Sequence, residues 1–123
     1  MPLDKFQTYN LEEKFSKFGE KIINLVKQAP VNIVTKPIIN QLIRSGTSIG
    51  ANYMEANGAS SKNDFKNKIY ICKKEAKETM YWLRMLAQTD EKSKPECRLL
   101  WTEVQGYAKM FSKIITTLKI NKK

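Results

Sequence analysis

Residues 44–55 read RSGTSIGANYME, a stretch that has the periodicity of a helix and almost none of the charge that a solvent-facing helix carries. Between residues 36 and 58 there are three charged side chains, whereas residues 62–88 contain seven basic and three acidic ones. At about 100° per residue, the apolar side chains of the segment gather on one side of the helix. They are Ile39, Leu42, Ile43, Gly46, Ile49 and Tyr53.

The opposite side of this helix carries small and polar residues where an ordinary surface helix has lysines and glutamates. These residues are Arg44, Ser48, Asn52 and Glu55, with Thr47 and Ala51 beside them. Small side chains let another backbone approach closely. We therefore expect this helix to be covered on both sides, by its own bundle and by a second subunit.

Apolar residues recur at alternating spacings of three and four along most of the chain, which predicts four helices. We place these helices at about residues 8–29, 36–57, 62–89 and 94–119. The apolar stripe of the first helix is Leu11, Phe15, Phe18, Ile22 and Leu25. That of the third helix is Phe65, Ile69, Cys72, Ala76, Met80 and Leu83. That of the fourth helix is Leu100, Val104, Tyr107, Phe111, Ile114 and Leu118. Four amphipathic helices with short connections predict one all-α domain over residues 1–123, an up-down-up-down antiparallel four-helix bundle.

The breaks between the helices carry start and stop signals. Pro30 ends the first helix, and Pro37 is tolerated in the first turn of the second, for which Thr35 is the expected N-cap. Asn57–Gly58 is a suitable left-handed terminator of the second helix. Two capping boxes then open the third and fourth helices. The capping pairs are Ser61 with Asp64 and Ser93 with Glu96.

The composition argues against most classes of enzyme. The chain has no histidine, which removes the commonest general base and the commonest transition-metal ligand. It also lacks the P-loop, GxGxxG and HExxH patterns. Cys72 and Cys97 lack the spacing of a C-x-x-C motif and are expected to be free and reduced. We therefore expect a protein that is not an enzyme and that holds neither a metal ion nor a cofactor.

The same sequence predicts a cytoplasmic protein. No apolar run approaches the roughly 20 residues that span a bilayer. The first residues, MPLDKFQTYN, lack a basic segment followed by an apolar one. We therefore expect neither secretion nor a membrane partner.

The net charge is +10, and it is placed unevenly. Residues 1–61 carry 7 basic and 5 acidic groups, whereas residues 62–123 carry 15 basic and 7 acidic groups. Such an asymmetry favours a polyanionic partner, with nucleic acid ahead of a membrane surface.

Much of this charge forms two rows at helical spacing, one on the third helix and one on the fourth. Tyr70 and Tyr81 border the row of the third helix. The two rows are Lys62, Lys66, Lys73, Lys77 and Arg84, and Arg98, Lys109, Lys113 and Lys119. Positive side chains beside aromatic rings suit a phosphate backbone, and we assign these nine residues to nucleic-acid binding. The alternative is a solvated face that keeps the protein soluble, and the sequence alone favours neither interpretation over the other.

Another face of the third helix carries two carboxylates among apolar groups. Its residues are Ile71, Glu75, Glu78, Trp82 and Met85. Glu75 and Glu78 are close enough to share a cation, but no further ligand lies near them in sequence. Pairing with Arg44, across a helix or subunit contact, is the favoured hypothesis because a guanidinium binds carboxylates bidentately. Ser48 is interpreted as a helix-packing residue, since the chain has no histidine and lysine is the only possible base for a nucleophilic serine.

Residues 41–86 resemble the small four-helix bundle proteins encoded within intervening sequences of bacterial 23S ribosomal RNA genes, sometimes labelled S23 ribosomal proteins. The resemblance covers nearly the whole chain and rests on three groups of residues. These are Arg44, Ser48, Asn52 and Glu55, in the pattern R-x3-S-x3-N-x2-E; Ser61, Lys62, Asp64 and Phe65, at the start of the third helix; and Glu75, Glu78 and Leu83. That family is similar in fold to the accessory variability proteins of diversity-generating retroelements.

The resemblance implies an assembly and partners. The retroelement accessory proteins are basic homopentameric barrels that work with a reverse transcriptase and its RNA. By resemblance, this chain would form a homopentameric ring in which the small-residue helix lines subunit contacts. The expected subunit-interface residues are Arg44, Ser48, Asn52, Glu55, Glu75, Glu78 and Trp82.

Two hypotheses of function follow. The first is a non-enzymatic, oligomeric accessory protein that binds RNA, or a complex of RNA with a reverse transcriptase, through its two basic rows. The alternative is a protein–protein scaffold that presents Trp82, Met85 and Trp101 to a protein partner, with no nucleic-acid role. Reversing the charge of the row on the third helix would abolish activity under the first hypothesis and leave it intact under the second.

Overall fold

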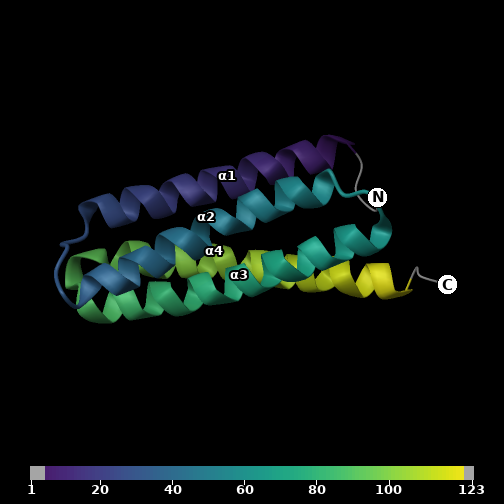
Figure 1. The fold of residues 1–123 in the computed structure, drawn as a ribbon. Coiled ribbons are helices and arrows are strands. Elements are labelled where there is room, and N and C mark those ends of the chain that lie inside the picture. Colours follow the sequence, from purple (N-terminus) through teal and green to yellow (C-terminus); the bar gives the residue numbers. More distant parts are fainter. Residues whose placement is uncertain (1–4, 121–123) are drawn as a thin grey trace.

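The chain folds into four long helices and no strand over the residues described. The computed structural model describes residues 5–120, and their side chains from residue 10 to residue 119. In chain order the elements are α1 (Lys5–Gln28), α2 (Thr35–Asn57), α3 (Lys62–Thr89), the single 3₁₀ turn η1 (Glu91–Ser93) and α4 (Lys94–Ile120). Consecutive helices run antiparallel and make an elongated four-helix bundle, with the connections at its two ends (Figure 1).

The helices do not pack equally around the bundle. α2 packs along α3 and α3 along α4, whereas α1 packs mainly on α2 and makes little contact with α4. Aromatic rings bridge that weaker seam. The ring of Phe15 on α1 meets those of Tyr107 and Phe111 on α4, with centroids 5.0 and 5.2 Å apart. Packing between neighbouring helices is therefore most extensive from α2 through α3 to α4.

The core follows most of the predicted stripes, but Leu11, Ile43 and Met80 are only partly buried, and α4 shows one exchange. Phe111 and Leu118 are buried as expected, but Ile115 is buried between them while Ile114 is only partly buried. Ile114 lies 11 residues after Glu103, which pairs with Lys21 of α1, and so shares the sparsely packed side of α4. The exchange therefore reflects the closer packing of α4 on α3.

Gly46 lets α1 and α2 approach closely. A Cβ added to Gly46 would lie 2.9 Å from Ile22 Cγ1, whereas one added to Gly50 would lie 3.5 Å from the backbone of Phe15, an ordinary van der Waals contact. On the other helix, a Cβ at Gly19 would lie 3.7 Å from Thr47. Thr47 was expected on the side facing another subunit; it packs against α1 of the same chain instead. Part of the small-residue surface of α2 is therefore explained by the bundle itself.

The start of α2 differs from its prediction. Thr35 is not the N-cap: it is the first helical residue, buried, and its hydroxyl donates to the carbonyl of Pro30 at 2.6 Å. The Asn32 carboxamide oxygen accepts instead from the backbone N–H groups of Val34 and Thr35, both at 2.9 Å. Asn32 therefore satisfies backbone N–H groups at the entry to α2, ahead of those that a capping threonine would have served.

The other helix ends give a mixed outcome. Ser61 caps α3 as predicted, since its hydroxyl accepts from the N–H of Asp64 at 3.0 Å. Gly58 ends α2 at φ −96°, so the expected left-handed terminator is wrong. The expected capping role of Ser93 is also wrong, because its hydroxyl donates to the carboxylate of Asp90 in the turn before α4. The backbone N–H of Ser93, for which the Glu96 carboxylate was the expected acceptor, donates instead to the backbone carbonyl of Asp90 at 3.1 Å.

Candidate functional site

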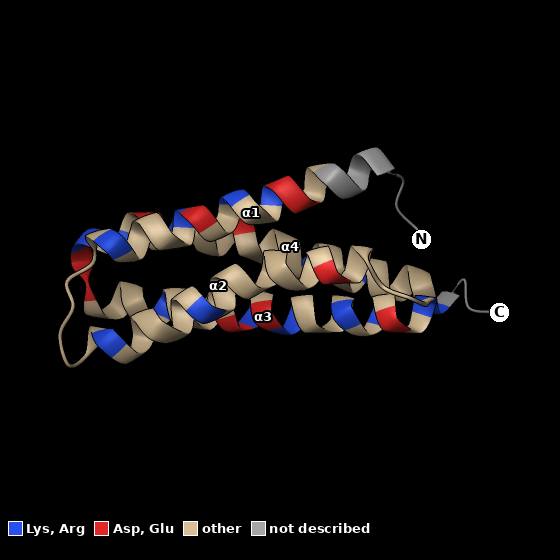
Figure 2. Ribbon diagram, turned by 45° about the horizontal axis from the view of Figure 1, so that its top comes forward, with Lys and Arg blue, Asp and Glu red and all other residues tan. Residues whose placement is uncertain are grey.

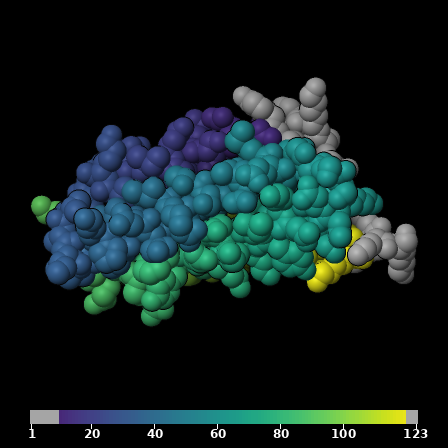
Figure 3. Space-filling view, viewed as in Figure 1, coloured from purple at the N-terminus to yellow at the C-terminus, as the bar shows by residue number. Residues whose placement is uncertain are grey.

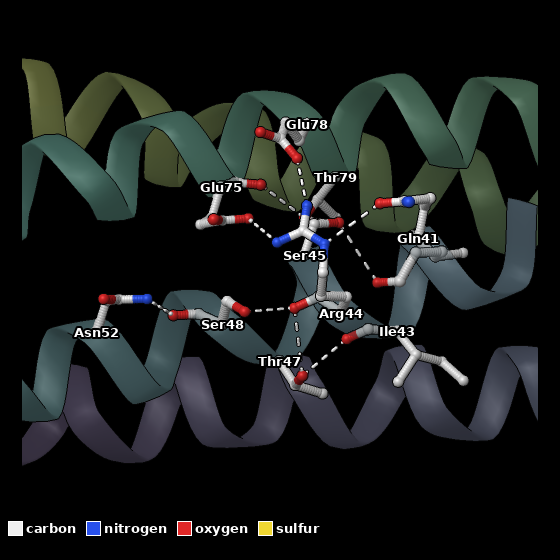
Figure 4. A network of polar contacts seen from close by, with 11 residues as sticks. Gln41, Ile43, Arg44, Ser45, Thr47, Ser48, Asn52, Glu75, Glu78 and Thr79 are labelled. Atoms are coloured by element: carbon white, nitrogen blue, oxygen red, sulfur yellow. Dashed lines mark hydrogen bonds and ion pairs between the residues drawn. The ribbon is translucent and has the colours of Figure 1, made fainter.

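A network of ionic and polar contacts joins α2 to α3 at mid-length (Figure 4). Arg44 Nη1 lies 3.1 Å from Glu75 Oε1, and Arg44 Nη2 donates to the carboxylate of Glu78. Arg44 Nε also donates to Gln41 at 3.2 Å. The Glu75 side chain is only 7% exposed, whereas that of Arg44 is 47% exposed. The pairing predicted for Arg44 is thus present, and it lies within one chain.

The charge of Arg44 is held firmly in this network. Partial burial by itself would lower the pKa of Arg44, but the charges and hydrogen bonds of Glu75 and Glu78 outweigh it and leave that pKa above its ordinary value. Under the network, the buried hydroxyl of Thr79 donates to Ser45 at 3.0 Å. The cluster therefore links α2 to α3, and each of its charged side chains takes part in an ion pair.

The outward edge of α2 satisfies its own polar groups. The hydroxyl of Ser48 donates to the carbonyl of Arg44, and Asn52 Nδ2 donates to the carbonyl of Ser48 at 2.8 Å. Glu55 pairs with Lys68 on α3 at 2.9 Å. Figure 3 shows α2 and α3 side by side on this face of the molecule. Among the described residues the serine hydroxyl contacts no base, and its hydrogen bond is to the backbone of its own helix.

Trp82 and Trp101 lie on different surfaces. Trp82 packs edge-on to Tyr81, with centroids 4.8 Å apart, in a groove that Gln41 of α2 also lines. Trp101 lines a different groove, between α3 and α4. The scaffold hypothesis has both tryptophans presented to a protein partner; within one chain they lie in separate grooves, on different sides of α3.

The two basic rows form no ion pair with the part of the chain that the structure describes. Among the residues described, the cations that do form ion pairs are others: Lys17, Lys21, Arg44, Lys68 and Lys94. None of the nine basic residues assigned to nucleic-acid binding pairs with a described carboxylate. Figure 2 shows basic residues recurring along α3. Within residues 10–119, therefore, no ion pair neutralises the positive charge of these nine side chains.

Members of the two rows meet at the seam between α3 and α4. At one end, Lys62, Lys66 and Leu118 line a groove of about 240 Å³. Nearby, Lys119 Nζ lies 5.9 Å from the ring centroid of Tyr70, a cation–π arrangement. A second groove at the other end brings together Arg84 of α3 and Arg98 of α4. We call this surface the basic seam and define it by Lys62, Lys66, Arg84, Arg98 and Lys119, together with Lys73 and Lys109, which helical spacing assigns to the same faces of α3 and α4.

Two predicted residues lie apart from the seam. Lys77 lines the groove that contains Trp82, on the side of α3 that faces α2. Lys113 is exposed, and it lies about 100° around the α4 axis from Lys94, which lines the second seam groove. Lys94 and Gln88, which sequence reasoning missed, line the second seam groove. Lys94 could have been found from its spacing, since it lies one heptad before Trp101 on the same face of α4.

The fold and these surfaces define a basic, antiparallel four-helix bundle in which ion pairs link α2 to α3 and a positively charged seam lies between α3 and α4. The chain belongs to the 23S rRNA-intervening sequence protein family, whose profile matches residues 7–113. It is also similar to a protein of unknown function from the S23 ribosomal protein family of Bacteroides thetaiotaomicron VPI-5482, solved at 1.70 Å resolution. The two share 33% identity over 89% of this chain and 97% of the other, with a TM-score of 0.75.

Comparison with curated protein sequences gives no significant match. Over the described residues, no helix combines the length and the apolar character that crossing a membrane requires.

Proposed function

We propose that this protein is a non-enzymatic, oligomeric accessory factor that binds RNA, or a complex of RNA with a reverse transcriptase, through its basic seam. The observation that carries the proposal is that the cations of the seam are left unpaired, while the ion pairs of the described residues use other cations. Unpaired lysines and arginines are available to displace the counterions of a phosphate backbone, which is the main source of affinity for nucleic acids.

Two of the three acidic residues of α3 support the same surface. Glu75 and Glu78 face α2 and pair with Arg44, so their negative charge is directed away from the seam. From Lys62 to Arg84 the row extends over about 33 Å of helix, at 1.5 Å per residue. That length suits contacts to several phosphates in succession.

Fluorescence anisotropy with a labelled RNA hairpin tests the proposal. The test variant carries Lys62→Glu, Lys66→Glu and Lys73→Glu on the seam. The control variant carries Lys14→Glu, Lys27→Glu and Lys36→Glu, three exposed lysines on α1 and α2 without a described ion pair. The two variants have the same net charge, so a difference between them reports the surface and not the overall field.

We expect the affinity of the seam variant to fall at least about 10-fold further than that of the control. The slope of log affinity against log salt should also fall by about 0.7–0.9 for each phosphate that the variant no longer neutralises. Equal losses of RNA affinity in the two variants would mean that overall charge, and not the seam, accounts for binding. Absence of RNA binding by the unaltered protein would overturn the proposal and favour the scaffold alternative.

The proposed oligomer is a homopentamer, by resemblance to the retroelement accessory proteins. Its support here is the outward edge of α2, where Ser48 and Asn52 bond to their own helix and Ala51 is small and exposed. Five chains of 14.2 kDa would have a mass of about 71 kDa by light scattering. Ala51→Arg should lower that mass and Ser16→Arg, on exposed α1, should not; a monomer would end the ring proposal.

Gene context tests the partner. A neighbouring reverse-transcriptase gene would support the retroelement partner, and an insertion in a ribosomal RNA gene without one would count against it.

A further inference from the structure

We propose that the groove between the C-terminal half of α3 and the start of α4 is a site for one unpaired nucleotide of RNA, with its base against Trp101 and its phosphates on Arg84 and Arg98. This inference rests on the proposed function and adds a ligand class and a position to it. It separates single-stranded from double-stranded RNA as the preferred partner.

The groove has the size and walls of a small-ligand site. Its volume is about 480 Å³, within the roughly 300–1,000 Å³ of pockets that hold small ligands. Its lining residues are Leu83, Arg84, Ala87, Gln88, Lys94, Cys97, Arg98 and Trp101. Both helices contribute to it, so the packing of α3 on α4 creates the site.

The floor of the groove is apolar and fixed. Leu83 is fully buried and Cys97 is 2% exposed, and both belong to the hydrophobic core. Burial raises the pKa of the Cys97 thiol to about 11, so the sulfur carries no charge at neutral pH. Trp101 is partly buried and packs against the same core, which holds its ring in place. Such a floor accepts the flat, weakly polar face of a nucleobase.

The rim of the groove is cationic. Arg84 and Arg98 are exposed and make no ion pair with a described residue, whereas the Lys94 ammonium group lies 2.8 Å from Glu91. The two guanidiniums are therefore the groups free to take a phosphate, in the bidentate manner that arginine favours. Gln88 adds an amide that can bond to a base edge.

An indole recessed in a groove selects against duplexes. Bases in a double helix are stacked on one another and cannot reach a partly buried ring, whereas an unpaired base can leave its neighbours and stack on it. Base–aromatic stacking is worth about 1–3 kcal/mol per base. Free cations beside an apolar, aromatic floor thus fit a single-stranded segment, a loop or a bulge.

The chain offers a direct probe, because Trp82 and Trp101 are its only tryptophans. In Trp82→Phe, Trp101 is the sole emitter, and oligouridine should quench its fluorescence. In Trp101→Phe, Trp82 is the sole emitter, on the other side of α3, and the same titration should leave its fluorescence unchanged. Anisotropy with labelled oligouridine and with a blunt RNA duplex of equal length completes the experiment.

Trp101→Leu should weaken oligouridine binding by about 5- to 150-fold, the equivalent of the stacking energy. Duplex binding should change less than about 2-fold, and Trp101→Phe should restore most of the affinity for oligouridine. Arg84→Gln with Arg98→Gln tests the rim by the same measurements and replaces only exposed side chains, so its fold should persist.

The possible outcomes separate the two proposals. If oligouridine binds but Trp101 emission does not change, or if Trp101→Leu weakens both RNAs equally, the nucleotide site is overturned and RNA binding by the seam stands. If neither RNA binds the unaltered protein, both proposals fail. Selective loss of oligouridine binding together with quenching of Trp101 supports both.

Discussion

The guanidinium of Arg44 on α2 contacts the carboxylate of Glu75 on α3 at 3.1 Å, and Glu75 is almost completely buried. A buried carboxylate is costly unless a cation and hydrogen bonds compensate it. Glu78, 38% exposed, accepts from the same guanidinium. One arginine thus neutralises a buried and a half-exposed acid and fixes the register of α2 on α3.

Replacing the cation in this pair should destabilise the fold. Arg44→Gln leaves the Glu75 carboxylate buried without its partner, and we expect a loss of about 2–4 kcal/mol, slightly below the loss for fully buried pairs because Arg44 is half exposed. A double-mutant cycle with Glu75→Gln, measured by urea unfolding, should give a coupling above about 1 kcal/mol. The same cycle on the exposed pair Lys68–Glu55 should give less than about 1 kcal/mol. Equal couplings would contradict the structural role.

Gly46→Ala should destabilise the α1–α2 contact. The new methyl group would lie 2.9 and 3.1 Å from the two γ carbons of Ile22 and 3.3 Å from its Cβ, so the branched stem must move. Overpacking costs about 1–3 kcal/mol, and the higher helix propensity of alanine returns about 1 kcal/mol. Gly106→Ala has nothing within 4 Å and should be neutral or stabilising. In an Ile22→Ala background, Gly46→Ala should lower the free energy of unfolding by less than it does in the unaltered protein, as measured by thermal unfolding. A Gly46→Ala variant that is more stable than the unaltered protein would refute the close approach.

The loop between α1 and α2 should depend on Asn32. Asn32→Ala removes the oxygen that accepts from two backbone N–H groups and should cost about 0.5–2 kcal/mol, as loss of a helix cap does. Asn32→Asp keeps the acceptor and should retain most of the stability. Asn40→Ala, exposed on α2 and without a described side-chain hydrogen bond, is the control in the same denaturation assay. A loss with Asn32→Asp as large as with Asn32→Ala would argue against the cap.

Alkaline pH should destabilise the fold through its buried thiols. Burial raises the pKa of Cys72 to about 12 and that of Cys97 to about 11, whereas an unfolded thiol ionises near pH 8.5. The unfolded chain therefore releases protons that the folded chain keeps. The resulting stability is fully present below about pH 8.5 and falls as the pH rises toward the folded values, by about 1.4 kcal/mol per pH unit for each thiol.

Cys97→Ala should remove its share of that slope between about pH 9 and 11. Val104→Ala provides the matched control, since it removes a buried apolar side chain and no titrating group. Chemical unfolding at a series of pH values should show a shallower decline only for Cys97→Ala. Parallel declines in the two variants would mean that Cys97 does not contribute.

The local features of the fold could be predicted from the sequence because helical periodicity and breaks depend on residues close together in the chain. Capping was harder. Thr35 and Gly58 are residue types that suit the roles assigned to them, but in the structure the Thr35 hydroxyl donates to the carbonyl of Pro30 and Asn32 accepts from the N–H groups at the entry to α2. Several residue types can serve one helix end, and the path of the loop selects among them.

The candidate site divides in the same way. Spacing along single helices was enough to predict four amphipathic helices, two basic rows and an arginine with two possible carboxylate partners. Tertiary packing was needed to establish that Arg44 reaches Glu75 within its own chain, that α3 separates Trp82 from Trp101, and that Arg84 and Arg98 share one groove. Those relations depend on the register of one helix against another, which side chains remote in sequence fix together when they pack.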